Sequence, residues 1–152
     1  MEVFRISASI HAHSLTASGR ANRWNLDGQK VIYTGGSRSL STLELLVSGG
    51  AISPSVKYLV MVISLADEED LIQTILIRDL PGNWRFQEAY SELQAFGNKW
   101  YKKAENLILK VPSAVIPKEY NYVINLTHPA FLKKVKLVRK EAYFWDDRLV
   151  KK

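Results

Sequence analysis

The segment from Val56 to Leu65 is a nearly continuous apolar run that contains several β-branched residues. Such a run is typical of a strand in the interior of a sheet. It is far shorter than the roughly 20 apolar residues of a membrane-spanning helix. Ile72 to Ile77 resembles a second strand, which ends before the turn signal Leu80-Pro81-Gly82. We therefore expect both segments in a central sheet.

Shorter segments also carry strand signals. Val3 to Ile6 is expected to form a short edge strand, Lys30 to Thr34 lies between glycine-containing turns, and Leu107 to Val111 is ended by Pro112. Phe131 to Val138 resembles a short helix that runs into a last strand. The strands are therefore expected to be distributed along the whole chain.

Two helices are predicted from apolar residues at helical spacing. One extends from Ser39 to Ser48, with Ser37 or Ser39 as its cap and Gly49-Gly50 at its end. The other extends from Phe86 to Lys103, with Gly97 as a weak point. Helices interspersed irregularly with strands predict a mixed α+β fold.

Length and composition are those of an ordinary globular protein. The 152 residues fit a single domain, 1–152. Hydrophobic residues make up 47% and charged residues 24%, so neither disorder nor a membrane class is expected. The N-terminus has no basic segment followed by the apolar core of a signal peptide, and we expect a cytoplasmic protein.

The residue types available for catalysis are limited. Cysteine is absent, which excludes disulfides, thiol nucleophiles and thiolate metal ligands. The three histidines, His11, His13 and His128, have no neighbouring cluster of acidic residues that would complete a metal shell. We therefore expect no metal site, and an oxygen nucleophile or water in any reaction.

The net charge of +6 permits binding of nucleic acid, anionic lipid or a small anionic substrate, but it selects none of them. The densest basic patch covers residues 133–140, where lysine and arginine are interleaved with Val135, Leu137 and Val138. This interleaving favours a half-buried strand with a solvated basic face over a nucleic-acid site.

Glu44 lies at the edge of the apolar stripe of its predicted helix, one turn from Leu40 and three residues from Val47. A carboxylate in that position is partly desolvated, so it needs a cation, hydrogen-bond donors or a catalytic role. The alternative, which the pattern by itself favours, is a glutamate whose carboxylate reaches solvent.

Three further segments contain candidate binding residues. The predicted loop 20–25 carries Arg20 and Arg23, whose planar guanidinium groups suit bidentate phosphate contacts, although surface charge above a buried tryptophan is the alternative. Tyr33 ends a predicted strand, where a core tyrosine is the commoner outcome. Ser113 lies between two prolines without a nucleophile elbow, so it is a better candidate for hydrogen bonding to substrate than for acyl chemistry. No P-loop or GxGxxG motif occurs.

Taken together, these segments resemble the RES family, named for a conserved arginine, glutamate and serine. The resemblance spans nearly the whole chain. The residues that carry it, in the family's order, are Arg23-Trp24-Asn25 with Gly28, Val31-Ile32-Tyr33-Thr34, Ser39-Leu40-Ser41-Thr42-Leu43-Glu44, Leu80-Pro81 with Trp84, Val111-Pro112-Ser113, Asn121-Tyr122, Asn125, His128-Pro129 and Asp147-Arg148-Leu149. Three positions depart from the family: Ala21 and Asn22 replace a pair of glycines, and Ser48 replaces a histidine.

The resemblance implies an ADP-ribosyltransferase-like fold, in which a split β-sheet core with flanking helices holds a dinucleotide in a cleft. It implies the toxin of a bacterial type II toxin–antitoxin pair, with NAD⁺ as substrate and no cofactor. The implied enzyme is an NAD⁺ glycohydrolase or an NAD⁺ phosphorylase, which cleaves the nicotinamide–ribose bond with water or inorganic phosphate. An Xre-type helix-turn-helix antitoxin is the implied partner, in a toxin–antitoxin hetero-oligomer.

The resemblance also assigns residues to the site. The expected catalytic residues are Arg23, Tyr33, Glu44 and Ser113. The expected substrate-binding residues are Arg20, Trp24, Asn25 and Asn125. Glu44 would stabilise the positive charge that develops on the ribose. The two arginines would hold the pyrophosphate, and Tyr33 would stack on or orient the nicotinamide ribose.

Two alternatives stay open. An ADP-ribosyltransferase would use the same cleft to modify a macromolecule instead of water or phosphate. A basic module would bind nucleic acid through residues 133–140 without catalysis, but no recognised nucleic-acid motif accompanies this charge.

Overall fold

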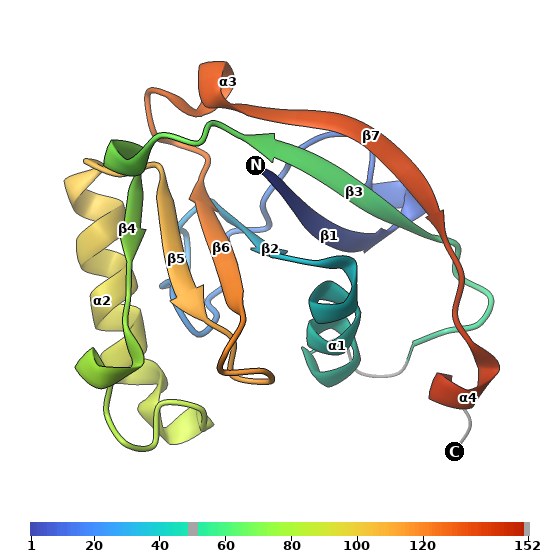
Figure 1. Cartoon of the computed structure of the whole chain (residues 1–152), viewed down its shortest axis with the longest axis horizontal. Helices are drawn as coiled ribbons and strands as arrows, with labels where there is room; N and C mark the ends of the chain where they lie inside the picture. The colour runs from blue at the N-terminus through green and yellow to red at the C-terminus, as the bar shows by residue number, and fades with distance from the viewer. Residues whose placement is uncertain (49–51, 151–152) are drawn as a thin grey trace.

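The strands and helices alternate irregularly along the chain in the computed structural model, which describes residues 1–48 and 52–150 (Figure 1). The strands are β1 (Glu2–Ala8), β2 (Val31–Gly35), β3 (Tyr58–Leu65), β4 (Ile72–Thr74), β5 (Ile108–Pro112), β6 (Tyr120–Asn125) and β7 (Val135–Tyr143). The α-helices are α1 (Arg38–Ser48), α2 (Tyr90–Lys103), α3 (Phe131–Lys134) and α4 (Asp147–Val150). Short 3₁₀ helices cover Ser9–His11, Glu69–Leu71, Ile77–Asp79 and Gln87–Ala89.

The seven strands form one sheet in the order β4-β5-β6-β2-β1-β3-β7, antiparallel except for the β4–β5 pair. β1 pairs with β3 along its whole length, and β2 pairs with β6 from Val31 to Gly35. β1 and β2 share a single register pair, Phe4 with Gly35. The sheet is therefore split into two halves, β4-β5-β6-β2 and β1-β3-β7, that meet at one point.

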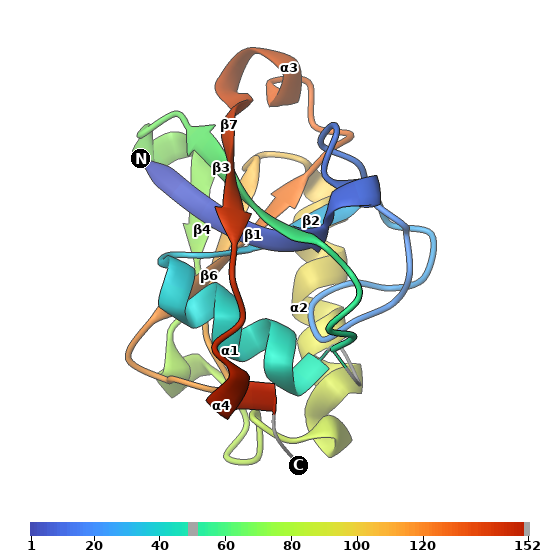
Figure 2. The ribbon, with the colours of Figure 1, turned by 90° about the vertical axis from the view of Figure 1, so that its right-hand side faces the viewer.

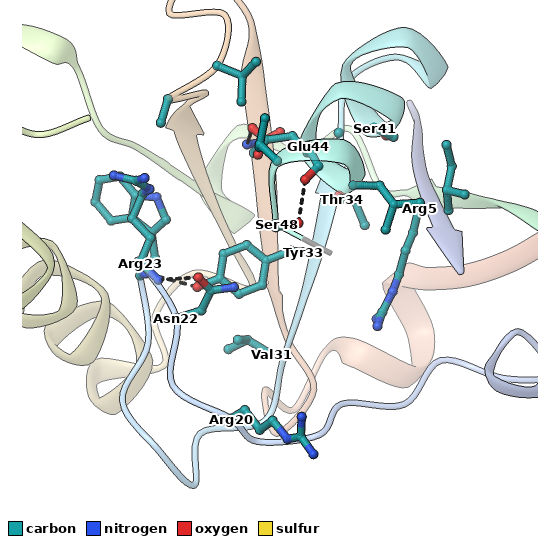
Figure 3. A pocket seen from close by; sticks show the side chains of 18 of the residues that line it. Arg5, Arg20, Asn22, Arg23, Val31, Tyr33, Thr34, Ser41, Glu44 and Ser48 are labelled. Atoms are coloured by element: carbon teal, nitrogen blue, oxygen red, sulfur yellow. Dashed lines mark hydrogen bonds between the residues drawn. The ribbon is translucent and has the colours of Figure 1, made fainter. Parts of the chain in front are cut away.

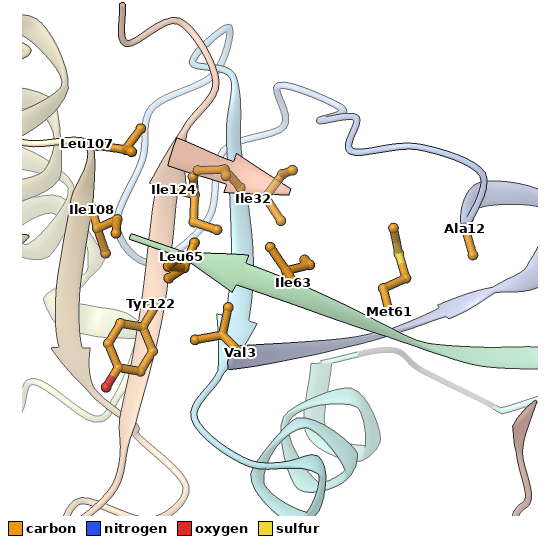
Figure 4. Close-up of a cluster of buried hydrophobic side chains, with 11 residues drawn as sticks. Val3, Ala12, Ile32, Met61, Ile63, Leu65, Leu107, Ile108, Tyr122 and Ile124 are labelled. Atoms are coloured by element: carbon orange, nitrogen blue, oxygen red, sulfur yellow. The ribbon is translucent and has the colours of Figure 1, made fainter. Parts of the chain in front are cut away.

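Apolar side chains from both halves of the sheet pack together (Figure 4). Val3 and Met61 from β1 and β3 belong to the same buried cluster as Ile32, Ile108 and Ile124 from β2, β5 and β6. Burial of such side chains is the dominant favourable contribution to folding. This cluster holds the two halves against each other although few backbone hydrogen bonds join them.

Each half of the sheet is covered by its own helix (Figures 1 and 2). On α2, Leu93 and Trp100 pack in a second buried cluster with Leu109 of β5 and Val123 of β6. On α1, Leu45 packs against Phe4, Ile6, Val60 and Val62 of β1 and β3. The two helices lie over different halves, so the junction of β1 and β2 lies between them.

Several sequence predictions are confirmed. The fold is mixed α+β, and both predicted helices form, with α1 capped by the Ser37 hydroxyl, which accepts a hydrogen bond from Leu40 N–H at 3.0 Å. α3 runs directly into β7, an edge strand on which Lys136, Arg139 and Lys140 are exposed. The predicted end of α1 at Gly49-Gly50 lies outside the described residues.

Three predictions were wrong in detail, and one strand was missed. β1 lies inside the sheet, because both β2 and β3 pair with it. β4 ends at Thr74 and lies at the edge, where it has one neighbour, β5, over three residues. α2 begins at Tyr90, after a 3₁₀ turn that leaves Phe86 outside the helix. β6 was not predicted, because Asn121 interrupts its apolar pattern.

No helix within the described ranges is long and apolar enough to cross a membrane.

Candidate active site

A cavity opens where β1 and β2 diverge beyond the Phe4–Gly35 pair. Its volume is about 840 Å³, within the range of small-molecule sites in proteins. Arg5 and Ile6 line it from β1, and Val31, Tyr33 and Thr34 line it from β2. The split in the sheet therefore creates the cavity, because side chains rather than a paired strand face each other across the gap.

Helix α1 brings Glu44 to this cavity. The Ser41 hydroxyl donates a hydrogen bond to the Phe4 carbonyl oxygen at 2.9 Å, which fixes the helix to β1. Gly35 permits this close approach, since a Cβ atom there would lie 2.5 Å from Ser41 Oγ. Glu44 is one turn further along the helix, half-buried and on the wall of the cavity.

Two neutral donors hold the Glu44 carboxylate. The Ser113 hydroxyl donates to Glu44 Oε1 at 2.7 Å, and the Asn121 side-chain amide donates to the same oxygen at 2.6 Å. No described residue donates to Oε2, and Glu44 forms no ion pair with any of them. The carboxylate is therefore oriented while its negative charge stays uncompensated.

Ser113 is fully buried behind Glu44. Its hydroxyl oxygen accepts hydrogen bonds from the backbone N–H groups of Val115 and Ile116, both at 3.1 Å. The hydroxyl proton is then directed to Glu44. Ser113 was expected to donate a hydrogen bond to substrate, but its hydroxyl donates to the Glu44 carboxylate and Ser113 does not line the cavity. Its position suits a residue that orients Glu44.

Arg23 lies on the cavity wall opposite Arg5, with Tyr33 between them in Figure 3. Its guanidinium group donates to the carbonyl oxygens of Trp84 at 2.8 Å and Arg85 at 3.1 Å. It also lies over the Tyr90 ring, 4.8 Å from the centroid. Neutral groups therefore fix the Arg23 cation, as they fix the Glu44 anion.

Tyr33 supports the loop of residues 20–25, which carries Arg20 and Arg23 and is called the arginine loop below. Its hydroxyl accepts a hydrogen bond from the Trp24 backbone N–H at 3.0 Å and donates to Asn25 Oδ1 at 2.7 Å. Burial raises the pKa of the Tyr33 phenol well above its usual value, so the group stays protonated. With its hydroxyl committed to the loop, Tyr33 has its ring available to a ligand in the cavity.

The arginine loop is also packed tightly onto α2. Gly97 lies so close to it that a Cβ atom would be 1.7 Å from the Trp24 carbonyl oxygen. Gln94, one turn earlier on α2, donates to the Asn22 carbonyl oxygen at 2.9 Å. The Asn22 side-chain oxygen accepts a hydrogen bond from the backbone N–H of Arg23 at 2.8 Å. Asn22, which replaces a glycine of the family pattern, therefore contributes directly to the loop.

The structure places the eight predicted site residues in two groups. Arg20, Arg23, Trp24, Tyr33 and Glu44 line the cavity, although Trp24 is only 2% exposed. Ser113, Asn25 and Asn125 are buried and do not line it.

The two buried asparagines bond to the protein itself. Asn25 donates to the carbonyl oxygens of Arg20 and Leu26, at 2.9 and 3.0 Å, and accepts from Tyr33. Asn125 accepts hydrogen bonds from the backbone and the hydroxyl of Thr127, at 2.9 and 2.7 Å. Both side chains are thus placed to support loops, which differs from the expected contact with substrate.

Three residues of the site were not predicted as site residues: Arg5, Arg85 and Asn121. Arg5 and Arg85 line the cavity, and Arg85 donates through Nε to the Ala114 carbonyl oxygen at 2.8 Å. The signal for Arg5 was its position as the one charged residue within the apolar segment Val3 to Ile6. Asn121 belongs to the family pattern, but nothing in its spacing predicts a contact with Glu44.

Metal binding has no support from the described residues. No group of three or more His, Cys, Asp or Glu residues among them is arranged to hold an ion. His128 is buried and accepts a hydrogen bond from the Ala130 N–H at 3.1 Å through Nδ1.

The charged residues that line the cavity are four arginines, Arg5, Arg20, Arg23 and Arg85, and one carboxylate, Glu44.

Comparison with known proteins identifies relatives over nearly the whole chain. The family model described as the RES domain matches residues 2–146. The Prs ADP-ribosylating toxin of Sphingobium sp. (strain YBL2) is 31% identical over 151 residues, covering 95% of this chain and 91% of the relative. Proteins named Toxin Res are 32% identical in Yersinia enterocolitica (84% of this chain, 82% of the relative) and 27% identical in Photorhabdus laumondii (99% and 98%).

Proposed function

The chain belongs to the RES-domain family, and from that premise we propose that it is a toxin that cleaves the nicotinamide–ribose bond of NAD⁺. One observation carries the proposal. Glu44 presents a fixed carboxylate to the cavity, held by Ser113 and Asn121 rather than by a cation. A carboxylate without a protein counter-ion is suited to stabilising positive charge on a substrate.

The proposed reaction generates such a charge. Nicotinamide leaves with the electron pair of the bond to the ribose and becomes neutral, so the ribose carbon acquires oxocarbenium-like positive charge. Glu44 stabilises this charge through the oxygen that neither Ser113 nor Asn121 contacts. A water oxygen then bonds to the ribose carbon and releases a proton, which gives ADP-ribose. With inorganic phosphate as acceptor, the product is a phosphorylated ADP-ribose.

The remaining cavity residues bind the substrate. Arg23 and Arg20 supply positive charge for the pyrophosphate, and Arg23 is held rigidly by the carbonyl groups of Trp84 and Arg85. The Tyr33 ring provides an apolar face for the nicotinamide end, since its hydroxyl is engaged by the loop. Ser113 and Asn121 position the carboxylate. The protein thus uses no cofactor in this scheme, because NAD⁺ is consumed.

The acceptor distinguishes two related functions. Water or phosphate would make the protein an NAD⁺ glycohydrolase or NAD⁺ phosphorylase, whereas a protein or nucleic-acid acceptor would make it an ADP-ribosyltransferase. The name of the Sphingobium relative, an ADP-ribosylating toxin, favours the second candidate. Both reactions pass through the same cation, so Glu44 and the arginines have the same roles in each.

The proposed partner is an Xre-type helix-turn-helix antitoxin in a toxin–antitoxin hetero-oligomer. The support is that the relatives from Yersinia and Photorhabdus carry the name toxin. Direct binding of nucleic acid by this chain is not part of the proposal, because its densest basic patch is the solvated face of an ordinary edge strand, β7.

The test is incubation of the purified chain with NAD⁺, alone, with inorganic phosphate and with a cell lysate as a source of macromolecular acceptors. Free nicotinamide and its partner product are separated by chromatography, and transferred ADP-ribose is detected on macromolecules. Nicotinamide release that disappears in Glu44→Ala supports the proposal, and the partner product identifies the acceptor. A folded wild-type protein that releases no nicotinamide under any of these conditions contradicts it.

A further inference from the structure

The base of the arginine loop is held by two amide side chains that lie outside the cavity, Gln29 and Asn98. Gln29 follows the loop along the chain, and Asn98 lies on α2, next to Gly97. We infer that Asn98 is a positioning residue, which fixes the arginine loop through Gln29 and thereby the place of Arg23 in the cavity. The inference rests on the proposed function, in which Arg23 binds the pyrophosphate.

The arginine loop is a narrow turn whose two arms are joined by backbone hydrogen bonds. Its tip, residues 23–24, lies between Asn22 and Asn25, whose backbone groups bond to each other at 3.1 and 3.3 Å. Just outside the loop, the Gly28 N–H donates to the Gly19 carbonyl oxygen at 2.7 Å. Displacement of the base therefore moves the tip, because the arms are linked to each other at both levels.

Gln29 closes the turn at this base. Its side-chain oxygen accepts a hydrogen bond from the Leu26 N–H at 2.8 Å, and its own backbone N–H donates to the Leu26 carbonyl oxygen at 3.3 Å. Its side-chain amide nitrogen donates to Asn98 Oδ1 at 2.9 Å. Gln29 is only 8% exposed, so without this acceptor its amide would be left largely desolvated and unpaired. The Asn98 oxygen thus holds the side chain that closes the turn.

The bond between Gln29 and Asn98 belongs to a polar stripe on α2. Three side chains of this helix, at helical spacing, bond in turn to three positions of the segment 22–30. The pairs are Gln94 with the Asn22 carbonyl oxygen, Asn98 with the Gln29 side chain and Tyr101 with the Lys30 N–H. An apolar contact is non-directional, whereas each of these bonds requires one relative placement of the helix and the segment. α2 therefore sets the position of the arginine loop as well as supporting it.

Calorimetry with ADP as the probe tests the effect on binding without turnover. Asn98→Ala removes the acceptor and should weaken ADP binding by roughly 3- to 10-fold, the contribution of one ordinary hydrogen bond. Alanine is the stronger helix former, so such a loss does not come from unfolding of α2. Asn98→Asp keeps an oxygen acceptor at the same position and should bind ADP as wild type does. The matched control is Asn106→Ala, which removes a half-buried amide and its hydrogen bond outside the cavity and should leave ADP binding unchanged.

A double-mutant cycle tests the pair itself. Gln29→Glu keeps the acceptor for the Leu26 N–H, and the Asn98 amide can turn and donate to the new carboxylate. Each single carboxylate variant therefore keeps one donor and one acceptor in the pair, whereas Gln29→Glu combined with Asn98→Asp places two carboxylates opposite each other. The double variant should lose at least as much ADP affinity as Asn98→Ala. Wild-type affinity in the double variant overturns the inference, because the loop would then keep its place without this bond.

Amide hydrogen exchange in the free protein separates the positioning role from the proposed function. The Asn25 and Gly28 N–H groups should exchange roughly 3- to 10-fold faster in Asn98→Ala, and the N–H groups of β3 should not change. A role in stability alone would lower Tm and speed exchange throughout the protein while leaving ADP affinity unchanged, which overturns the inference. Faster exchange at the loop, with no ADP binding by wild type, supports Asn98 as its support and contradicts the proposed function. Where NAD⁺ is cleaved, Asn98→Ala should raise KM more than it lowers kcat, because Glu44 is held by other residues.

Discussion

Charged side chains are arranged in opposite ways in the cavity and on the outer surface formed by β1, α1 and β7. On that surface, Arg38 makes two hydrogen bonds to Glu141, at 2.7 and 2.8 Å. Arg139 bonds to Glu141 at 3.1 Å and to Glu2 at 2.9 Å. Two arginines and two glutamates therefore compensate one another.

In the cavity, charged groups are fixed by neutral partners. Glu44 is held by a hydroxyl and an amide, and Arg23 is held by two carbonyl oxygens. Arg5 has one long contact with a carbonyl oxygen. None of these three forms an ion pair with a residue in the described part of the chain.

This difference indicates which charged groups are free to interact with a ligand. Exposed ion pairs contribute little to stability and leave no net charge for a ligand. Charges that are oriented by neutral groups keep their full interaction with a substrate, and the protein need not reorganise when the substrate binds. The charges of the cavity are thus arranged as the proposed substrate binding requires, and those of the outer surface are not.

The largest expected effect comes from displacing the arginine loop. Gly97→Ala places a Cβ atom against the Trp24 carbonyl oxygen, so α2 and the loop must separate. Such overpacking should cost about 3 kcal/mol of unfolding free energy, which lowers Tm by roughly 6 to 12 °C in a domain of this size. Gly82→Ala is the matched control, because a Cβ atom there meets no atom within 4 Å. Equal melting temperatures for the two variants would contradict the packing described for the loop.

The next effect concerns the neutral partners of Glu44. Asn121→Ala and Ser113→Ala each remove one hydrogen bond to the carboxylate. A hydrogen bond to a charged group is worth about 1.5 to 3 kcal/mol, so each variant should slow nicotinamide release by roughly 10-fold or more. Asn106→Ala, which removes a half-buried amide that lies outside the cavity and bonds to the Asp70 carbonyl oxygen, is the control. Unchanged rates in both test variants would mean that Glu44 does not need these donors.

Ser113→Ala should also lower Tm, because the backbone N–H groups of Val115 and Ile116 lose their acceptor. Asn121→Ala should affect the rate more than the stability. Thermal melting of the two variants separates these contributions.

The smallest expected effect is the pH dependence of the outer surface. Arg38 and then Arg139 lower the pKa of Glu141 from 4.5 to about 2 in the folded protein. A lowered folded-state pKa means that the stabilisation is complete above pH 4.5 and is lost as the pH falls toward 2. Wild type should therefore melt slightly above Glu141→Gln at neutral pH, and the difference should shrink over that interval. A difference that stays constant down to pH 2 would contradict the ion pairs as its source.

Local signals in the sequence were sufficient for much of the fold. Helical spacing and a cap at Ser37 or Ser39 predicted α1, and with it the position of Glu44 at the edge of an apolar stripe. The apolar run from Val56 to Leu65 predicted β3. These features depend on neighbours within one or two turns or on a single strand.

Features that depend on distant pairing could not be predicted. Val3 to Ile6 has the same pattern in an edge strand as in an interior one, and the partners of β1 lie about 30 and 60 residues away in the sequence. For the same reason, the sequence does not distinguish a polar side chain that lines a cavity from one that is buried beside it. Ser113 and Asn25 were therefore expected to contact substrate. The family resemblance grouped the segments correctly but did not give the direction of each side chain.

The most direct test of the central claim is the rate of nicotinamide release from NAD⁺ by wild type, Glu44→Gln and Glu141→Gln. Both substitutions remove one carboxylate charge and preserve the shape of the side chain, but Glu44 lies in the cavity and Glu141 lies in the surface ion-pair network. We expect Glu44→Gln to lose at least about 100-fold in rate, and Glu141→Gln to keep the wild-type rate. Equal rates for the two variants would contradict the assignment of the uncompensated Glu44 charge to catalysis.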